Sequence, residues 1–133
     1  MRVAFTIHGE AASKANNRDI ITTPSGRYRV VKSPRALAFE SAALLQIPVA
    51  ARVMYTGPVR VTLRMFYRTE RPDLDESLVL DVLQARYTSG GVGRGLCSRR
   101  GVYVNDRQVR EKHVYHAIDA DSPRVDVLVE SLA

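Results

Sequence analysis

The sequence has 133 residues, of which 45% are hydrophobic and 26% are charged, and this composition is typical of one folded domain. No apolar run approaches the roughly 20 residues that a membrane-spanning helix needs, and the single cysteine, Cys97, excludes an internal disulfide bond. The first residues alternate like a strand and lack the apolar core of a signal peptide, so we expect a cytoplasmic protein with no membrane partner.

The charge is distributed unevenly along the chain, although the formal net charge is +6 overall. Residues 1–69 contain 11 Lys and Arg against 3 Asp and Glu, whereas residues 70–133 contain 9 against 11. A cationic body with a local excess of acid suits a polyanionic partner together with a metal site. A basic surface without a partner is the alternative, because net charge describes partners and solubility rather than fold.

The start of the chain predicts a strand and a hairpin. Apolar residues from Val3 to Ile7 alternate with others, as in a half-buried strand. A polar loop follows over residues 9–19. Residues 20–23 and 27–31 then flank a Pro-Ser-Gly turn, which predicts a hairpin.

The first helix is predicted to begin at Ser33-Pro34, because serine is a favoured N-cap residue and proline is favoured at the first helical position. Pro48 should end or kink this helix, because proline cannot donate a backbone hydrogen bond. From Val59 to Met65 apolar residues alternate with polar ones, which predicts a half-buried strand.

The second half of the chain predicts one more helix and several strands. A helix of about three turns is predicted from Leu74 to Leu83, and the stretch 87–101, rich in glycine and arginine, is predicted to be a mobile loop. Further strands are predicted at 102–104, 109–117 and 125–130. We therefore expect a single α+β domain over residues 1–133, with a mixed or antiparallel sheet and the two main helices packed on one face.

Two acidic clusters lie in the second half of the chain. The segment from Asp73 to Glu76 follows one predicted strand, and Asn105-Asp106 follows another. Because Mg²⁺ is usually held by one or two carboxylates with water and phosphate, carboxylates from both segments could position metal for phosphodiester hydrolysis. The structural alternative is that Asp73 caps the next helix, Asp75 lies in its first turn, and Asn105-Asp106 forms an ordinary turn.

These two segments, in this order, resemble the RusA family of Holliday junction resolvases. That family carries a DLDN-type motif after a strand and a V-x-x-DD-x-QV motif downstream. Here the motifs read Asp73-Leu74-Asp75-Glu76 and Val102-Tyr103-Val104-Asn105-Asp106-Arg107-Gln108-Val109. The resemblance also covers Ser-Lys-Ala-Asn-Asn-Arg at residues 13–18 and the stretch 27–34 before the first helix.

The resemblance implies a homodimeric, Mg²⁺-dependent endonuclease, with Mn²⁺ as a substitute, that resolves four-way DNA junctions by paired nicks. A dimer would supply two equivalent sites for a junction of approximate two-fold symmetry. The catalytic and metal-binding aspartates of the family fall on Asp73, Asp75 and Asp106. Asp81 matches a further helix aspartate with a supporting role. The family also leads us to expect a phage or prophage origin.

Three features of the sequence depart from the family pattern. Glu76 stands where the family has asparagine, and Asn105 stands where it has the first aspartate of the downstream pair; both would neighbour the catalytic residues. The lysine that the family has on the helix after the first motif is absent. Arg71, Arg86, Lys112 or an arginine of the glycine-rich loop could replace its charge beside the phosphate.

The candidate DNA contacts are cationic and amide side chains, because cations that neutralise phosphates give DNA binding its strength. They are Lys14, Asn16, Asn17, Arg18, Arg27, Arg29, Lys32, Arg35 and Arg71. Each cation could equally be a solvated surface charge. Three functions stand as alternatives to junction cleavage: a branched-DNA-binding protein with impaired catalysis, a metal-dependent nuclease for flaps or forks, and a basic interaction protein whose aspartates only form caps and turns.

Overall fold

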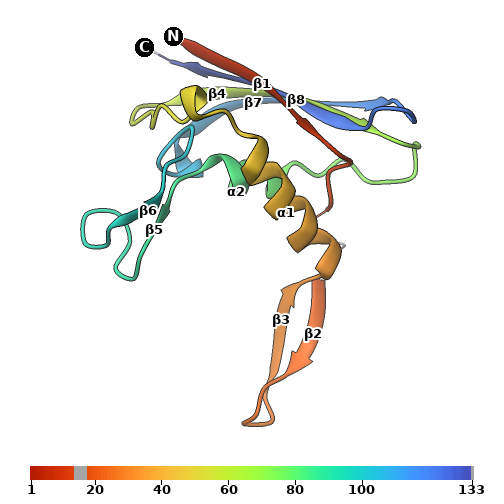
Figure 1. Ribbon diagram of the computed structural model, residues 1–133, viewed down its shortest axis with the longest axis vertical. Coiled ribbons are helices and arrows are strands. Elements are labelled where there is room, and N and C mark those ends of the chain that lie inside the picture. Colours follow the sequence, from red (N-terminus) through yellow and green to blue (C-terminus); the bar gives the residue numbers. More distant parts are fainter. Residues whose placement is uncertain (14–17, 133) are drawn as a thin grey trace.

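The computed structural model describes residues 1–13 and 18–132 as a two-layer α+β fold, in which helices cover one side of a four-stranded sheet (Figure 1). The elements in chain order are β1 (Arg2–His8), β2 (Arg18–Thr22), β3 (Tyr28–Lys32), α1 (Pro34–Gln46), the 3₁₀ helix η1 (Val49–Ala51), β4 (Val59–Tyr67), α2 (Ser77–Leu83), β5 (Arg86–Tyr87), β6 (Cys97–Arg99), the 3₁₀ helix η2 (Asp106–Gln108), β7 (Val109–Ile118) and β8 (Arg124–Ser131).

The main sheet is mixed, with the strand order β1-β8-β4-β7. Strand β8 runs antiparallel to both of its neighbours, so that Val127 lies opposite Phe5 of β1 on one side and Leu63 of β4 on the other. Strand β7 pairs parallel with β4. The predicted α+β class and mixed sheet are therefore confirmed, and the pairing of the first and last strands brings the two ends of the chain together (Figure 1).

Alternation along β4 and β8 decides which face of the sheet is buried. The inward side chains of the two strands are almost completely buried. They are those of Val59, Val61, Leu63, Met65, Val125, Val127 and Val129. They share one hydrophobic core with the buried faces of α1 and α2, which contribute Ala36, Phe39, Ala43, Leu78, Val79, Val82 and Leu83. Burial of apolar side chains at about 25 cal/mol per Å² is the main force that holds the two layers together.

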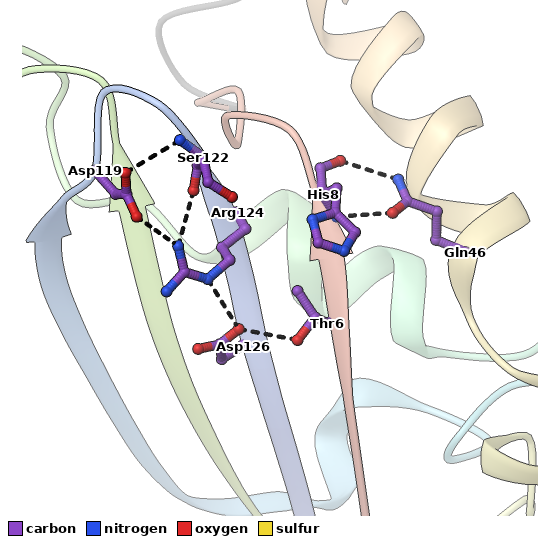
Figure 2. Close-up of polar contacts among 7 residues, drawn as sticks. All are labelled: Thr6, His8, Gln46, Asp119, Ser122, Arg124 and Asp126. Carbon is purple, nitrogen blue, oxygen red and sulfur yellow. Dashed lines mark hydrogen bonds and ion pairs between the residues drawn. The ribbon is translucent and has the colours of Figure 1, made fainter.

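Helix α1 begins as the sequence predicts. Ser33 is its N-cap and accepts a hydrogen bond from the backbone N–H of Ala36 at 3.2 Å, and proline occupies the first position. At the other end, Gln46 binds both backbone groups of His8 in the edge strand β1, with distances of 2.7 Å to the N–H and 2.9 Å to the carbonyl (Figure 2). The last turn of α1 is thereby attached to the sheet.

The opposite face of the sheet carries a polar network that is separate from the helices. Asp126 accepts a hydrogen bond from the hydroxyl of Thr6 at 3.0 Å, and Arg124 donates to Asp119 at 2.9 Å (Figure 2). Arg124 also covers the ring of Phe66, with 3.9 Å between its guanidinium carbon and the ring centroid. Arg124 therefore forms ion pairs with both Asp119 and Asp126.

Three predicted elements differ from the structure. Helix α2 has 7 residues rather than three turns from Leu74, because the side chain of Asp75 accepts a hydrogen bond from the N–H of Ser77 and replaces a preceding turn. The stretch 87–101, predicted to be a mobile loop, contains the β5–β6 hairpin, whose closing bonds join Thr88 and Leu96.

The predicted strand at 102–104 is also wrong. Tyr103 forms only isolated bridges, to Tyr55 and Gln84, so this buried extended segment lies between two others without joining a sheet. Among the described residues, no helix is long and apolar enough to cross a membrane, since α1, the longer of the two α-helices, has 13 residues.

Candidate functional site

The first acidic motif lies in the loop between β4 and α2. Tyr67, the last residue of β4, is buried, and its hydroxyl lies 3.4 Å from the carbonyl oxygen of Asp73. The ring of His116 from the neighbouring strand β7 stacks on Tyr67 with 5.0 Å between centroids. The parallel pairing of β4 with β7 therefore brings the rings of Tyr67 and His116 together next to this loop. Asp73 itself is exposed.

Asp75 holds three segments together through its two carboxylate oxygens. One oxygen accepts a hydrogen bond from the hydroxyl of Ser13 at 2.9 Å, and the other accepts from the backbone N–H of Ser77 at 3.0 Å. The proposed cap role of Asp73 is not observed, because Glu76 occupies the N-cap position and makes no side-chain cap bond. Asp75 instead satisfies a backbone donor at the start of α2, but it precedes the N-cap, so the alternative that placed it in the first turn is wrong.

Glu76 forms an ion pair with a residue that is distant in sequence. The Nζ atom of Lys112, on β7, lies 2.7 Å from its Oε1 atom, and the two side chains are 45% and 20% exposed. Of the cations considered as replacements for the family's helix lysine, Lys112 is thus the one that contacts the first acidic motif directly. Arg71 is exposed in the loop before Asp73.

Burial and the charges around Tyr67 keep its hydroxyl group protonated. Burial raises the pKa of Tyr67, and the negative charges of Asp75, Glu10 and Glu76 raise it further, although a hydrogen bond at the Asp75 backbone acts in the opposite direction. Tyr67 therefore keeps its proton at neutral pH. Its neighbour Glu10 accepts hydrogen bonds from the backbone of Arg68 and from the guanidinium of Arg35, both at 2.9 Å.

The second acidic motif lies near the end of α2. Asp106 begins the 3₁₀ helix η2, and its backbone N–H donates to the side chain of Gln84, the residue that follows α2, at 3.1 Å. Asn105 is the N-cap of η2 and accepts from the N–H of Arg107 at 2.9 Å. The predicted turn at Asn105-Asp106 is therefore present as a capped 3₁₀ helix.

The charges of Asp81 and Asp106 both act on one buried hydroxyl, that of Tyr103. Tyr103 is fully buried and donates a hydrogen bond to the carbonyl of Leu80 at 2.8 Å. Burial raises the pKa of Tyr103 far above its ordinary value, and the charges of Asp106 and Asp81 raise it further. The second motif and the helix aspartate therefore both act electrostatically on Tyr103.

The predicted DNA contacts occupy different environments. Arg27 and Arg29 are exposed on the β2–β3 hairpin, which projects from the body (Figure 1). Lys32 at the base of this hairpin pairs with Glu40 at 2.7 Å, and Arg35 pairs with Glu10. The predictions for Lys14, Asn16 and Asn17 lie outside the described residues, and only the backbone of Arg18 is described.

Sequence patterns did not identify Glu10, Tyr67 or His116 as neighbours of the acidic loop. Tyr67 ends β4, His116 lies on β7 and Glu10 lies in the loop after β1, so only the tertiary fold brings these residues together. Among residues 1–13 and 18–132, no three His, Cys, Asp or Glu side chains are grouped closely enough to hold a metal ion. Metal binding by Asp73, Asp75 and Asp106 therefore stays a prediction.

Comparison with models of known protein families gives no match, and comparison with curated proteins gives none. Membership of the RusA family accordingly stays an expectation from the sequence segments described above.

Proposed function

We propose that this protein is a metal-dependent, structure-selective endodeoxyribonuclease that resolves four-way junctions as a homodimer. The supporting observation is that the two acidic motifs lie at opposite ends of one short helix, which itself carries Asp81. The loop 73–76 leads into α2, Asp81 lies on it, and Asp106 is hydrogen-bonded to Gln84 at its end. A helix of 7 residues is about 10 Å long.

The donor set of the site fits Mg²⁺, which prefers oxygen ligands and commonly takes only one or two carboxylates besides water and phosphate. Asp73, Asp75 and Asp106 are the residues that would hold it. Bound there, the ion would polarise a phosphoryl oxygen and lower the pKa of a water molecule. The chain itself would orient these ligands, since Ser13 fixes the carboxylate of Asp75 and Gln84 fixes the backbone of Asp106.

Lys112 is our candidate for the cation that stabilises charge at the phosphate. It reaches the acidic loop from β7 rather than from the helix, and its ammonium group is held at Glu76, the residue that follows Asp75. An ammonium group placed at a developing negative charge is worth more in a partly dehydrated site than in water. The exposed arginines of the β2–β3 hairpin would bind phosphates farther along the DNA.

The test is cleavage of a synthetic mobile four-way junction with Mg²⁺. We expect paired nicks by the wild type and a loss of at least 100-fold in Asp73→Asn and Asp75→Asn. Asp126→Asn is the matched control, because Asp126 lies on the far face of the sheet and contacts Thr6 (Figure 2). Full activity in Asp73→Asn would disprove the mechanism.

Other outcomes select the alternatives. Junction binding without cleavage in both Mg²⁺ and Mn²⁺ would indicate a branched-DNA-binding protein. Preferred cleavage of flaps or forks in a panel of branched substrates would change the substrate and keep the metal mechanism. Sedimentation analysis tests the dimer separately.

A further inference from the structure

A polar pocket of about 410 Å³ lies beside the acidic site. Its charged and amide lining residues are Lys32, Glu40, Asp81, Gln84, Arg86 and Arg99. Lys32 ends β3, whereas Arg86 begins β5 and Arg99 ends β6, so the pocket lies at the bases of the two hairpins that project in Figure 1. Asp81 connects it to Asp106, because both carboxylates act on the hydroxyl of Tyr103.

Arg99 is the least satisfied charged group in this pocket. Its Nε atom is buried and has no hydrogen-bond partner among the described residues, and the side chain forms no ion pair with them. A guanidinium presents five N–H donors and has no means of losing its charge at neutral pH. Desolvating such donors without an acceptor is unfavourable, so a half-buried arginine of this kind is suited to an anion from outside the chain.

Neighbouring cations disfavour the charged form of Arg99. The pKa of Arg99 lies below its ordinary value because the group is buried and because Arg86 and Arg52 repel its charge, which Glu40 offsets only in part. Arg52 is held in place by bonds to two backbone carbonyls, each at 2.7 Å. Arg52, Arg86 and the acidic side chain of Glu40 therefore all act electrostatically on Arg99.

That acidic side chain is already engaged. One carboxylate oxygen of Glu40 accepts a hydrogen bond from the Nζ atom of Lys32 at 2.7 Å. The other oxygen lies 3.9 Å from the guanidinium of Arg86. Arg86 lines the pocket and its side chain is 61% exposed, so its guanidinium is accessible to a ligand from solvent. A tetrahedral oxyanion would offer acceptors to Arg86 and Arg99 at once, and guanidinium groups match phosphate through paired hydrogen bonds.

We propose that this pocket binds a backbone or terminal phosphate of a DNA strand, with Arg99 and Arg86 as its donors. That the phosphate belongs to DNA rests on the proposed function, whereas the anion site itself does not. A strand held here would pass between the bases of the two hairpins, and its next phosphates would lie towards Asp81 and Asp106.

The experiment measures binding without metal, so it is independent of cleavage. The wild-type protein in EDTA, at constant ionic strength, is titrated with 5′-phosphorylated dithymidine nucleotide while the Nε–Hε resonance of Arg99 is followed by NMR, and the backbone amide resonances are followed in the wild type and in every variant to obtain the affinity. Absence of the signal in Arg99→Gln assigns it. We expect a saturable shift, and binding at least tenfold weaker in Arg99→Gln and in Arg86→Gln. Arg94→Gln, at the exposed tip of the same hairpin, should bind like the wild type.

Three results would overturn the proposal. They are an Arg99 resonance that does not move, unchanged affinity in both pocket variants, and equal binding of an uncharged dinucleotide with a methylphosphonate linkage and no terminal phosphate. Inorganic phosphate is the further probe, and affinity equal to that of the dinucleotide would overturn the assignment to a DNA strand. Arg86→Gln keeps the test decisive if Arg99→Gln does not fold, because Arg86 is largely exposed. A junction that is not cleaved would count against the nuclease and leave these binding results intact.

Discussion

Lys112 and Glu76 lie 36 positions apart in the sequence, and their side chains meet at 2.7 Å where strand β7 passes the start of helix α2. The pair places one ammonium group directly beside the Asp73–Asp75 loop. Because both side chains are partly exposed, the contact contributes at most about 1 kcal/mol to folding. Its position therefore matters more than its strength.

Replacing Lys112 by methionine should slow junction cleavage about 100-fold, because the phosphate would lose a cation. Stability should change by less than about 1 kcal/mol. Single-turnover rates with bound junction measure the first effect, and urea unfolding measures the second. The double variant Glu76→Gln/Lys112→Met separates two roles. If the cation acts on phosphate, the double variant stays slow. Recovery of the wild-type rate would mean that Lys112 only neutralises Glu76.

Replacing Gln108 by alanine should lower both stability and cleavage. Its side chain accepts from the N–H groups of Val104 and Asn105 at 3.0 and 2.9 Å, and it donates to the carbonyls of Tyr55 and Gly57 at 2.6 and 2.9 Å. Loss of these bonds should cost about 2–3 kcal/mol in urea unfolding. It should also release the segment that carries the predicted catalytic residue Asp106.

Gln46→Ala is the matched control for that variant, because Gln46 also binds backbone groups, those of His8, but lies far along the chain from both acidic motifs. It should lose stability and retain the single-turnover cleavage rate of the folded protein. Equal cleavage by Gln108→Ala and wild type would show that the 3₁₀ helix does not position Asp106.

Replacing Gly101 by alanine should destabilise the protein by about 2–3 kcal/mol, because the added methyl group would overpack a closed contact. A Cβ atom at this position would collide with backbone atoms of Leu83, Gln84 and Ala85. The midpoint of urea unfolding measures the loss. Gly57→Ala is the control, since a Cβ atom there meets nothing within 4 Å. Similar midpoints for the two variants would contradict the close approach.

Asp119 should contribute stability that depends on pH. A hydrogen bond from Arg124 is the main cause that lowers the pKa of Asp119 below its ordinary value of 3.8. A carboxylate with a lowered pKa in the folded state stabilises the protein fully above its unfolded pKa, and this contribution is lost as the pH falls through the folded value. The variant Asp119→Asn should therefore lose less stability than the wild type on acidification below about pH 4. Urea unfolding at pH 6 and at pH 3 measures the difference, and equal losses in both proteins would contradict it.

Local signals in the sequence predict most elements of this fold. Alternation predicts β1, β4, β7 and β8, and the Ser33 cap predicts the start of α1, because each pattern depends only on neighbouring residues. Prediction from neighbouring residues alone fails at Tyr103. Its segment is extended and apolar like a strand, but it pairs through single bridges with two segments that are distant in sequence.

The sequence by itself also determined which charged groups the chain can offer, namely two acidic motifs and a cationic N-terminal half. Only the tertiary structure decided which charges meet. Parallel pairing of β4 with β7 brings Lys112 to Glu76, and the bases of two hairpins bring Arg86 and Arg99 together at one pocket. Periodicity identifies the buried face of an element but does not encode the order of strands in a sheet, and that order sets the distances between charged groups.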